Sequence, residues 1–338
     1  MDVGLAMSTH GLLTRDEQDF FLLRLEPAEM RPLELARLAE RLGYHSLWFS
    51  DHVCMGRELG TRHTANESGT RAYPERPVML DVVAAIGAIS AVTERIRLAP
   101  SVLIAPYRHP LIVAHQFATL DVLSNGRLIM SAGSGWDPQE FAAVGADYEH
   151  RGAVTEECVE LWKHAWTSDW LDWHGRFFEV ADVSLEPKPV QKPHPPIVFG
   201  AVTQVGARRA ARTSDGLYPM FLDARADPGR FDHLREAALR EAERAGRDLA
   251  GFRLYAFCSG LVTEPGDELA RAKPRRTLTG TAEQVLGDLE RFAAHGYSHV
   301  TVHFDVRSGT IEELLEIVER FAEEVLPAAR GIEAVPLQ

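Results

Sequence analysis

The sequence contains few cysteines, and their spacing is not that of a disulfide framework or a zinc site. Cys54, Cys158 and Cys258 lie far apart, and no Cys-x-x-Cys pair occurs. We therefore expect a reduced, cytoplasmic protein. The N-terminus lacks a basic region followed by an apolar run, so we expect no signal peptide. No apolar run reaches about 18 residues, so we expect no membrane-spanning helix.

Basic residues are in the minority. The chain has 36 Lys and Arg against 49 Asp and Glu, which gives a net charge of -13. This balance argues against nucleic acid or an anionic membrane as the main partner, but it permits a local basic pocket. A small-molecule substrate is the expected partner.

Several catalytic and metal-binding motifs are also missing. The sequence has no Gly-x-Ser-x-Gly elbow, no His-Glu-x-x-His motif and no Walker loop. No group of Asp and His has convincing metal-ligand spacing, so no metal site is predicted. His295 and His299 fall at a helix end and a strand start, and we expect them to be solvated or to cap those elements.

Short apolar segments alternate with longer segments that have helical periodicity. In the last helical segment, Leu314, Val318, Phe321 and Val325 fall on one side. We expect eight strands, over residues 3–7, 45–50, 96–104, 127–132, 196–200, 216–221, 252–262 and 299–304. We expect one helix after each strand, over residues 32–42, 80–92, 111–123, 155–167, 204–213, 228–245, 282–295 and 311–326.

This alternation predicts an α/β fold, the (β/α)8 TIM barrel. Short apolar strands without alternation are typical of a parallel sheet that is covered on both faces, and eight such units fit a closed barrel. A doubly wound open sheet is the alternative. Such a sheet usually begins with a glycine-rich dinucleotide turn, whereas the first turn here is Ser8-Thr9-His10-Gly11.

We expect a single domain over residues 1–330 and a C-terminal tail over residues 331–338. Two irregular insertions, at about residues 54–77 and 170–196, interrupt the barrel pattern. The second insertion contains an expected hairpin at residues 171–178. Because long irregular stretches often form lids or binding loops, we expect insertion loops at the C-terminal face of the barrel.

Reactive groups of a barrel lie where strands end and the next loops begin. The second expected strand ends at Ser50-Asp51-His52, an acid beside an imidazole. Such a pair at a strand end favours a site in which His52 holds or moves a proton and Asp51 assists it. The alternative is a capping Asp51 beside a solvated His52.

Two further strand ends carry small residues. Gly133-Ser134-Gly135-Trp136 follows the fourth strand, and its glycines would let a flat or phosphate-bearing group approach the backbone. Gly200-Ala201-Val202-Thr203 precedes a helix, so its backbone N–H groups and the Thr203 hydroxyl could surround a phosphate. The alternative for this segment is an ordinary helix cap by Thr203.

Four segments together resemble the bacterial-luciferase-like superfamily of flavin and deazaflavin barrels, over nearly the whole chain. They are L-G-Y-H-S-L-W-F-S-D-H (42–52), R-I-R-L-A-P-S-V-L-I-A-P-Y-R-H-P-L (95–111), S-N-G-R-L-I-M-S-A-G-S-G-W-D-P-Q-E-F (124–141) and E-P-K-P-V-Q-K-P-H-P-P-I (186–197). The resemblance implies a barrel enzyme. Because relatives in this superfamily are homodimers, it also implies a homodimer.

The superfamily has two branches. The branch that uses reduced FMN and oxygen often carries Glu-His-His after the second strand, and the branch that uses the deazaflavin F420 often carries Ser-Asp-His there. Ser50-Asp51-His52 resembles the second form. The resemblance thus implies an oxidoreductase that transfers a hydride between F420 and a small organic substrate; the alternative is an FMN-dependent monooxygenase. Relatives acting on sugar phosphates have a glutamate at about the position of Trp136, which argues against such a substrate here.

The same resemblance implies roles for individual residues. The deazaflavin ring would lie across the barrel mouth, touching Asp51 and His52, which are the expected catalytic residues. Relatives carry a cis peptide bond at the position of Ser101-Val102. The expected cofactor-binding residues are Asp51, Ser101, Val102, Gly133, Ser134, Gly135, Trp136, Gly200, Ala201 and Thr203. Neither the substrate nor the direction of hydride transfer follows from the sequence.

Overall fold

The computed structural model describes the chain from residue 1 to residue 337 except residues 8, 10, 16–20, 58–75 and 222–226. Most of the predicted insertion at residues 54–77 therefore lies outside the described residues.

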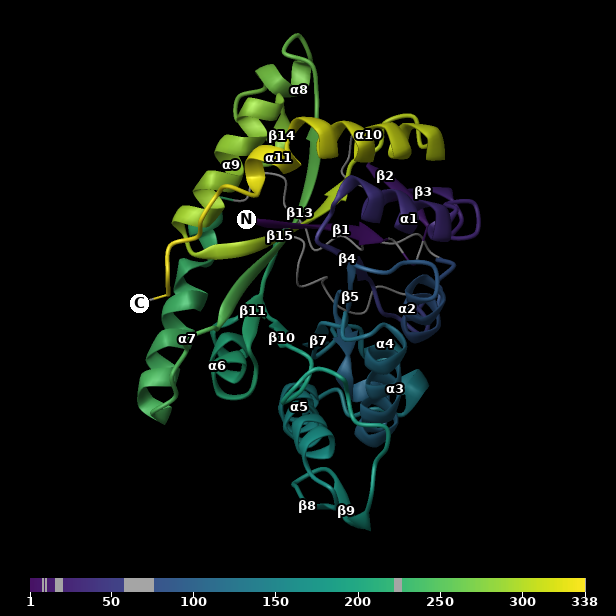
Figure 1. The fold of residues 1–338 in the computed structure, drawn as a ribbon, viewed down its shortest axis with the longest axis vertical. Coiled ribbons are helices and arrows are strands. Elements are labelled where there is room, and N and C mark those ends of the chain that lie inside the picture. Colours follow the sequence, from purple (N-terminus) through teal and green to yellow (C-terminus); the bar gives the residue numbers. More distant parts are fainter. Residues whose placement is uncertain (8, 10, 16–20, 58–75, 222–226, 338) are drawn as a thin grey trace.

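A parallel barrel forms the centre of the molecule (Figure 1). Its sheet runs in the order β5-β4-β1-β15-β13-β11-β10-β7-β6, and it closes where β6 pairs with β7 and Leu98 bridges Leu128. The predicted (β/α)8 barrel is thus confirmed. Its strands are β1 (Asp2–Met7), β4 (Ser46–Phe49), β5 (Arg97–Pro100), β6 (Leu103–Ile104), β7 (Met130–Gly133), β10 (Ile197–Gly200), β11 (Gly216–Tyr218), β13 (Arg253–Val262) and β15 (Tyr297–Phe304). Two short strands, β12 (Met220–Phe221) and β14 (Thr279–Gly280), also pair with β13.

Helices cover the outside of the barrel (Figure 1). Several begin with a side chain that accepts from the first turn, such as Asp81 before α2, Thr203 before α6 and Thr281 before α9. The long helices are α1 (Pro32–Leu42), α2 (Val82–Ser90), α3 (Pro110–Leu123), α5 (Arg151–Thr167), α6 (Gln204–Thr213), α7 (Asp232–Ala245), α9 (Ala282–Ala294) and α10 (Ile311–Glu324). The short ones are η1 (Ala105–Tyr107), α4 (Pro138–Val144), η2 (Pro228–Phe231), α8 (Glu268–Arg271) and α11 (Leu326–Ala329).

Two antiparallel hairpins lie outside the barrel. The hairpin of β2 (Leu12–Arg15) and β3 (Phe21–Leu25) was not predicted. The hairpin of β8 (Leu171–His174) and β9 (Glu179–Val183) matches the expected one. Its insertion starts after α5 and rejoins at the beginning of β10, so it leaves and enters at the N-terminal end of the barrel. The expectation that both insertions extend the C-terminal face is wrong for this one.

Apolar side chains fill the barrel and the layer between barrel and helices. Trp48, Tyr218, Tyr255 and Phe257 belong to a buried cluster of inward-facing strand residues. A larger cluster, which includes Phe199 and Trp162, packs between the strands and the outer helices. The rigid barrel therefore supports the loops at its C-terminal ends, where the site lies.

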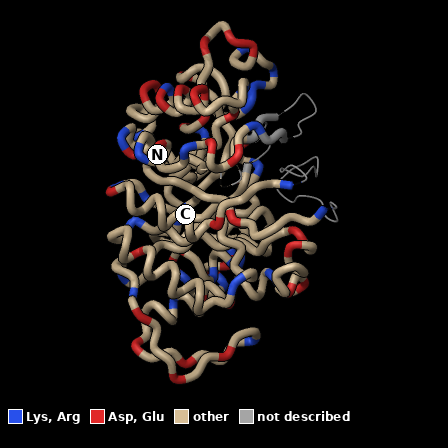
Figure 2. The backbone as a smooth tube through the Cα atoms, turned by 90° about the vertical axis from the view of Figure 1, so that its right-hand side faces the viewer, with Lys and Arg blue, Asp and Glu red and all other residues tan. Residues whose placement is uncertain are grey.

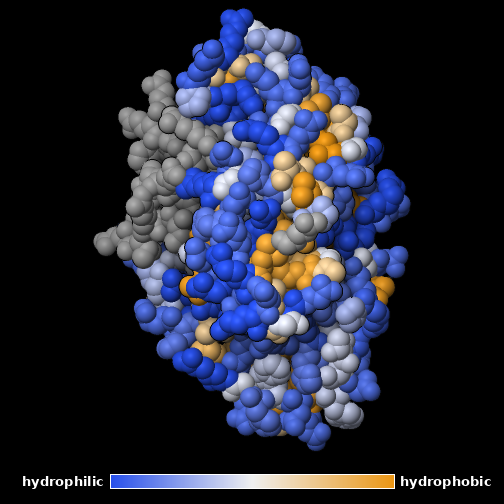
Figure 3. Space-filling view, turned by 90° about the vertical axis from the view of Figure 1, so that its left-hand side faces the viewer, coloured by the Kyte–Doolittle hydropathy of each residue, from blue (hydrophilic) through white to orange (hydrophobic). Residues whose placement is uncertain are grey.

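The outer surface is polar for the most part. Acidic and basic residues are interspersed along the chain on one side (Figure 2). The opposite side is largely hydrophilic with an apolar strip near its centre (Figure 3). Within the described part of the chain, no helix is both long and apolar enough to cross a membrane.

Candidate functional site

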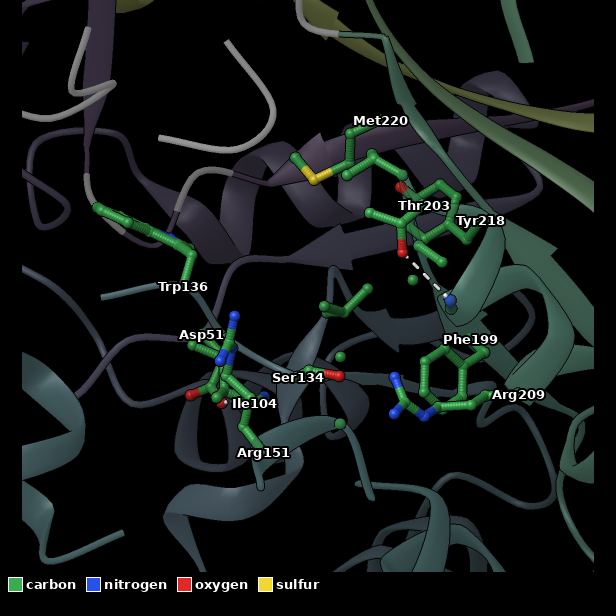
Figure 4. Close-up of a pocket in the computed structure, with 18 of the residues that line it drawn as sticks. Asp51, Ile104, Ser134, Trp136, Arg151, Phe199, Thr203, Arg209, Tyr218 and Met220 are labelled. Carbon is green, nitrogen blue, oxygen red and sulfur yellow. Dashed lines mark hydrogen bonds between the residues drawn. The ribbon is translucent and has the colours of Figure 1, made fainter. Parts of the chain in front are cut away.

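A pocket of about 540 Å³ lies at the C-terminal ends of the strands. Every residue that the sequence singled out as catalytic or cofactor-binding lines it: Asp51, His52, Ser101, Val102, Gly133, Ser134, Gly135, Trp136, Gly200, Ala201 and Thr203. Figure 4 shows Thr203, Phe199 and Arg209 on one side of the pocket and Asp51 and Trp136 on the other. Segments far apart in the sequence thus converge on one cavity.

Asp51 is held by a residue that the sequence did not suggest. Its carboxylate accepts two hydrogen bonds from the Arg108 guanidinium, each at 2.8 Å, and one from the Ile104 backbone N–H at 2.9 Å. Burial alone would lower the pKa of Arg108, but Asp51 outweighs it and raises that pKa. Asp51 therefore anchors the end of β4 to the end of β6, and its hydrogen bonds go to Arg108 and Ile104 rather than to His52.

The partner of His52 is Glu140, in the first turn of α4. Its fully buried carboxylate lies 2.8 Å from His52 Nδ1, and it accepts from the Tyr107 hydroxyl at 2.8 Å. The Val53 and Cys54 backbone N–H groups donate to its other oxygen. Sequence reasoning missed Glu140, although Asp137 and Pro138 mark the start of a short helix on which it sits.

Burial by itself would raise the pKa of Glu140. The hydrogen bonds and charge of its partners, with His52 first among them, outweigh burial, and the pKa lies below its usual value. The same carboxylate acts on Tyr107, where burial and the charge of Glu140 raise the pKa of the phenol. Glu140 is thus ionised and Tyr107 is a neutral donor at neutral pH.

Val102 lines the pocket. The Ser101–Val102 peptide bond is cis, as predicted. A Cβ at Gly200 would approach Val102 Cγ1 at 2.8 Å, and a Cβ at Gly133 would meet the same side chain. A side chain at either glycine would therefore collide with Val102, which is a packing reason for glycine at both positions. Gly135 has φ of 71°, a conformation that favours glycine.

The other end of the pocket has the features of an anion site. Helices α5 and α6 both begin there, and Arg151, Gly152, Thr203 and Arg209 line it. Free N–H groups and the positive end of the dipole at helix starts favour an anion. Thr203 also accepts from the Gly206 N–H at 3.2 Å, so the predicted alternative, a helix cap, is present. The Arg209 side chain reaches into the pocket from α6 (Figure 4).

Aromatic rings flank the centre of the pocket. The rings of Trp136 and His52 meet edge to face with centroids 6.0 Å apart. Tyr218 lies deeper, and its hydroxyl is 3.1 Å from the Ser101 hydroxyl. Burial raises the pKa of Tyr218, so this phenol is neutral. A flat ring could therefore lie between Val102 and these side chains.

A second polar cluster lies at the N-terminal end of the barrel. Asp2, His45 and His299 offer potential metal-ligand atoms that all lie within 4.8 Å of one another, although no metal site was predicted. His299 is fully buried, because β15 begins at Tyr297 and carries this side chain into the barrel. The expectation that His299 is solvated or caps the strand is wrong.

Positive charge surrounds this cluster. Arg253 donates to Asp2 Oδ2 at 2.6 Å. Burial lowers the pKa of both imidazoles, and the charges of Arg97 and Arg253 lower it further; at His45 the charge of Asp2 acts in the opposite direction. The two guanidinium groups outnumber the one carboxylate, which opposes a cation. We interpret the cluster as a group of polar side chains that fills the N-terminal end of the barrel.

Two proteins of similar sequence are named for different cofactors. The chain is 31% identical over 185 residues to an FMNH(2)-dependent dimethylsulfone monooxygenase of Pseudomonas putida, covering 54% of this chain and 46% of that protein. It is 32% identical over 188 residues to an F420-dependent glucose-6-phosphate dehydrogenase of Amycolatopsis mediterranei, covering 54% and 51%. In both cases about half of each protein is covered.

Solved structures share the fold. The monooxygenase RslO1 from Streptomyces bottropensis superimposes with a TM-score of 0.74 at 22% identity, over 97% of this chain and 99% of that one. The family model for the luciferase-like monooxygenases matches residues 25–322, which include all of the pocket residues named above. The chain therefore belongs to the luciferase-like monooxygenase family of flavin- and deazaflavin-dependent oxidoreductases.

Proposed function

We propose that this protein transfers a hydride between the deazaflavin F420 and a small organic substrate. The observation that carries the proposal is the Ser50-Asp51-His52 sequence at the wall of a pocket that also holds the cis Ser101–Val102 bond. The F420-dependent relative supports it. Sugar-phosphate enzymes of this branch carry a glutamate at about the position of Trp136, and the tryptophan here argues against a sugar phosphate as the substrate.

The residues of the pocket fit such a cofactor. Val102, Trp136 and Tyr218 offer surfaces for a flat ring, and Gly200 to Thr203 with Arg209 offer donors for a phosphodiester. When bound, the deazaflavin supplies a carbon-bound hydride. His52 would hold or release the proton that balances the charge of hydride transfer. Because Asp51 is bound to Arg108 and Ile104, its role is to fix the strand ends around the ring.

An FMN-dependent monooxygenase is the second candidate function. The same pocket would accept the ring and single phosphate of FMN, and an FMNH(2)-dependent relative is 31% identical to the chain. In that case the protein would be a monooxygenase supplied with reduced FMN by a separate reductase.

Two parallel assays test the proposal. In the first, the protein and reduced F420 are mixed without oxygen with a panel of ketones, imines and activated alkenes, and the return of oxidised F420 is followed. In the second, oxygen uptake is followed with reduced FMN and the same compounds. Oxygen-independent oxidation of F420 supports the proposal. Hydroxylated product formed only with reduced FMN and oxygen would establish the monooxygenase instead.

A further inference from the structure

Glu140 accepts four hydrogen bonds in a place where water does not compete. The donors are His52 Nδ1, the Tyr107 hydroxyl and the backbone N–H groups of Val53 and Cys54, at 2.6 to 3.2 Å. Its side chain is fully buried. This glutamate therefore ties α4 to the end of β4 and to η1, and it belongs to the support of the pocket wall.

An ionised carboxylate has no hydrogen to donate. The three other donors around Glu140 keep it in that form, since each stabilises the charged state. The hydrogen of the contact at 2.8 Å must then come from the imidazole, so His52 carries it on Nδ1. In neutral imidazole, Nε2 is then the nitrogen that accepts a proton.

We propose that Glu140 is the positioning residue of the site: it fixes the ring of His52 and its Nδ1–H tautomer, so that Nε2 is the nitrogen that exchanges a proton during turnover. The sequence assigned this supporting role to Asp51. Both oxygens of Asp51 are instead bound to Arg108, at 2.8 Å, and one also to the Ile104 N–H. The catalytic use of Nε2 rests on the proposed function, whereas the tautomer is a property of the protein alone.

The test measures the tautomer by ¹⁵N NMR of the full-length protein labelled at the ring nitrogens of histidine. The His52 signals are assigned by their loss in His52→Gln. At a pH where this imidazole is neutral, wild type should show a protonated Nδ1 and an unprotonated Nε2. In Glu140→Gln the carboxylate charge is lost, and the ratio of Nδ1–H to Nε2–H should fall about ten-fold or more.

Glu157→Gln is the matched control. Glu157 is also a buried glutamate with several donors, among them the N–H groups of Phe177 and Phe178, but it anchors the β8–β9 hairpin on α5. The Glu157→Gln substitution should leave the His52 signals unchanged. Tyr107→Phe removes one donor while keeping the carboxylate, so it should retain the Nδ1–H tautomer.

The wild-type spectrum decides the proposal even if Glu140→Gln fails to fold. An Nε2–H tautomer in wild type, or an unchanged ratio in a folded Glu140→Gln, would overturn it. The outcome is separate from that of cofactor choice. Failure of F420 to bind, with the expected tautomer, removes the proposed function alone, and F420 binding without that tautomer removes only the role of Glu140.

Discussion

His52 is the side chain on which the proposed chemistry depends, since an imidazole can hold or release a proton near neutral pH. We expect His52→Ala to lower turnover by about 10²- to 10⁴-fold while changing cofactor affinity far less. Steady-state rates and a cofactor titration on the same preparation measure the two effects. His174→Ala, on the exposed β8 strand, is the control. Equal turnover in wild type and His52→Ala at every pH would remove His52 from the mechanism.

Because Glu140 is buried and ionised in the folded protein, the free energy of unfolding depends on pH. Because its pKa in the folded protein is lowered, its stabilising contribution is present above the pKa of an unfolded glutamate, about 4.3, and is lost as the pH falls through the lower folded value. We expect Glu140→Gln to be about 2–3 kcal/mol less stable than wild type at pH 7. Urea unfolding should show that this difference shrinks at about pH 3.5. A difference that stays constant with pH would contradict this account.

For single residues, the sequence predicted which side chains line the pocket but not which side chains they bind. Asp51 and His52 were predicted because they are adjacent at a strand end. Arg108 lies 57 residues from Asp51, and Glu140 lies 88 residues from His52. Such pairs are formed by barrel closure, which local patterns do not encode. The motif that includes Trp136 and Glu140 pointed to the right loop, but not to which of its side chains faces His52.

Helix α6 places its first turn at the pocket, where Thr203 can serve as cap and as anion ligand. We expect Thr203→Val to weaken F420 binding by about 1–2 kcal/mol, but to leave binding of a fragment without the phosphodiester unchanged. Paired titrations with F420 and the fragment measure this. Thr281→Val, at the cap of α9 outside the pocket lining, should lower stability without changing either affinity. An equal loss for both ligands in Thr203→Val would mean that Thr203 only caps the helix.

Elements with strong local signals were predicted closely. The helices over residues 32–42 and 204–213 agree with α1 and α6, because Pro32 and Thr203 mark their starts. The expected strand over residues 96–104 divides into β5 and β6 around the cis Ser101–Val102 bond. The short helix α4 was missed, since seven residues give too few turns for a periodic pattern.

The whole barrel followed from the sequence because strand and helix alternate in eight units, and that number decides closure. The position of the second insertion was not predicted correctly. Residues 170–196 precede a strand, so they lie at the end of the barrel opposite the pocket. The substrate could not be predicted from the sequence either, because the residues of the insertion at 54–77 follow no pattern that is known to select a substrate.

The resemblance to dimeric barrels leads us to propose a homodimer. Ile112, Val122 and Leu123 on α3 are exposed apolar side chains that a second copy could cover. Light scattering coupled to gel filtration should give twice the 37.6 kDa of one chain. Leu123→Glu should shift the mass toward one chain if this helix lies in the interface. A mass of one chain for wild type at high concentration would contradict the dimer.

The preference of the protein for F420 over FMN can be measured by equilibrium binding. Oxidised F420 and FMN are titrated separately into one preparation of wild-type protein, and the quenching of tryptophan fluorescence is followed. We predict that F420 binds at least about ten-fold more tightly than FMN, a difference of about 1.4 kcal/mol. FMN binding as tight as that of F420 or tighter would contradict the account and place the protein with the FMN-dependent monooxygenases.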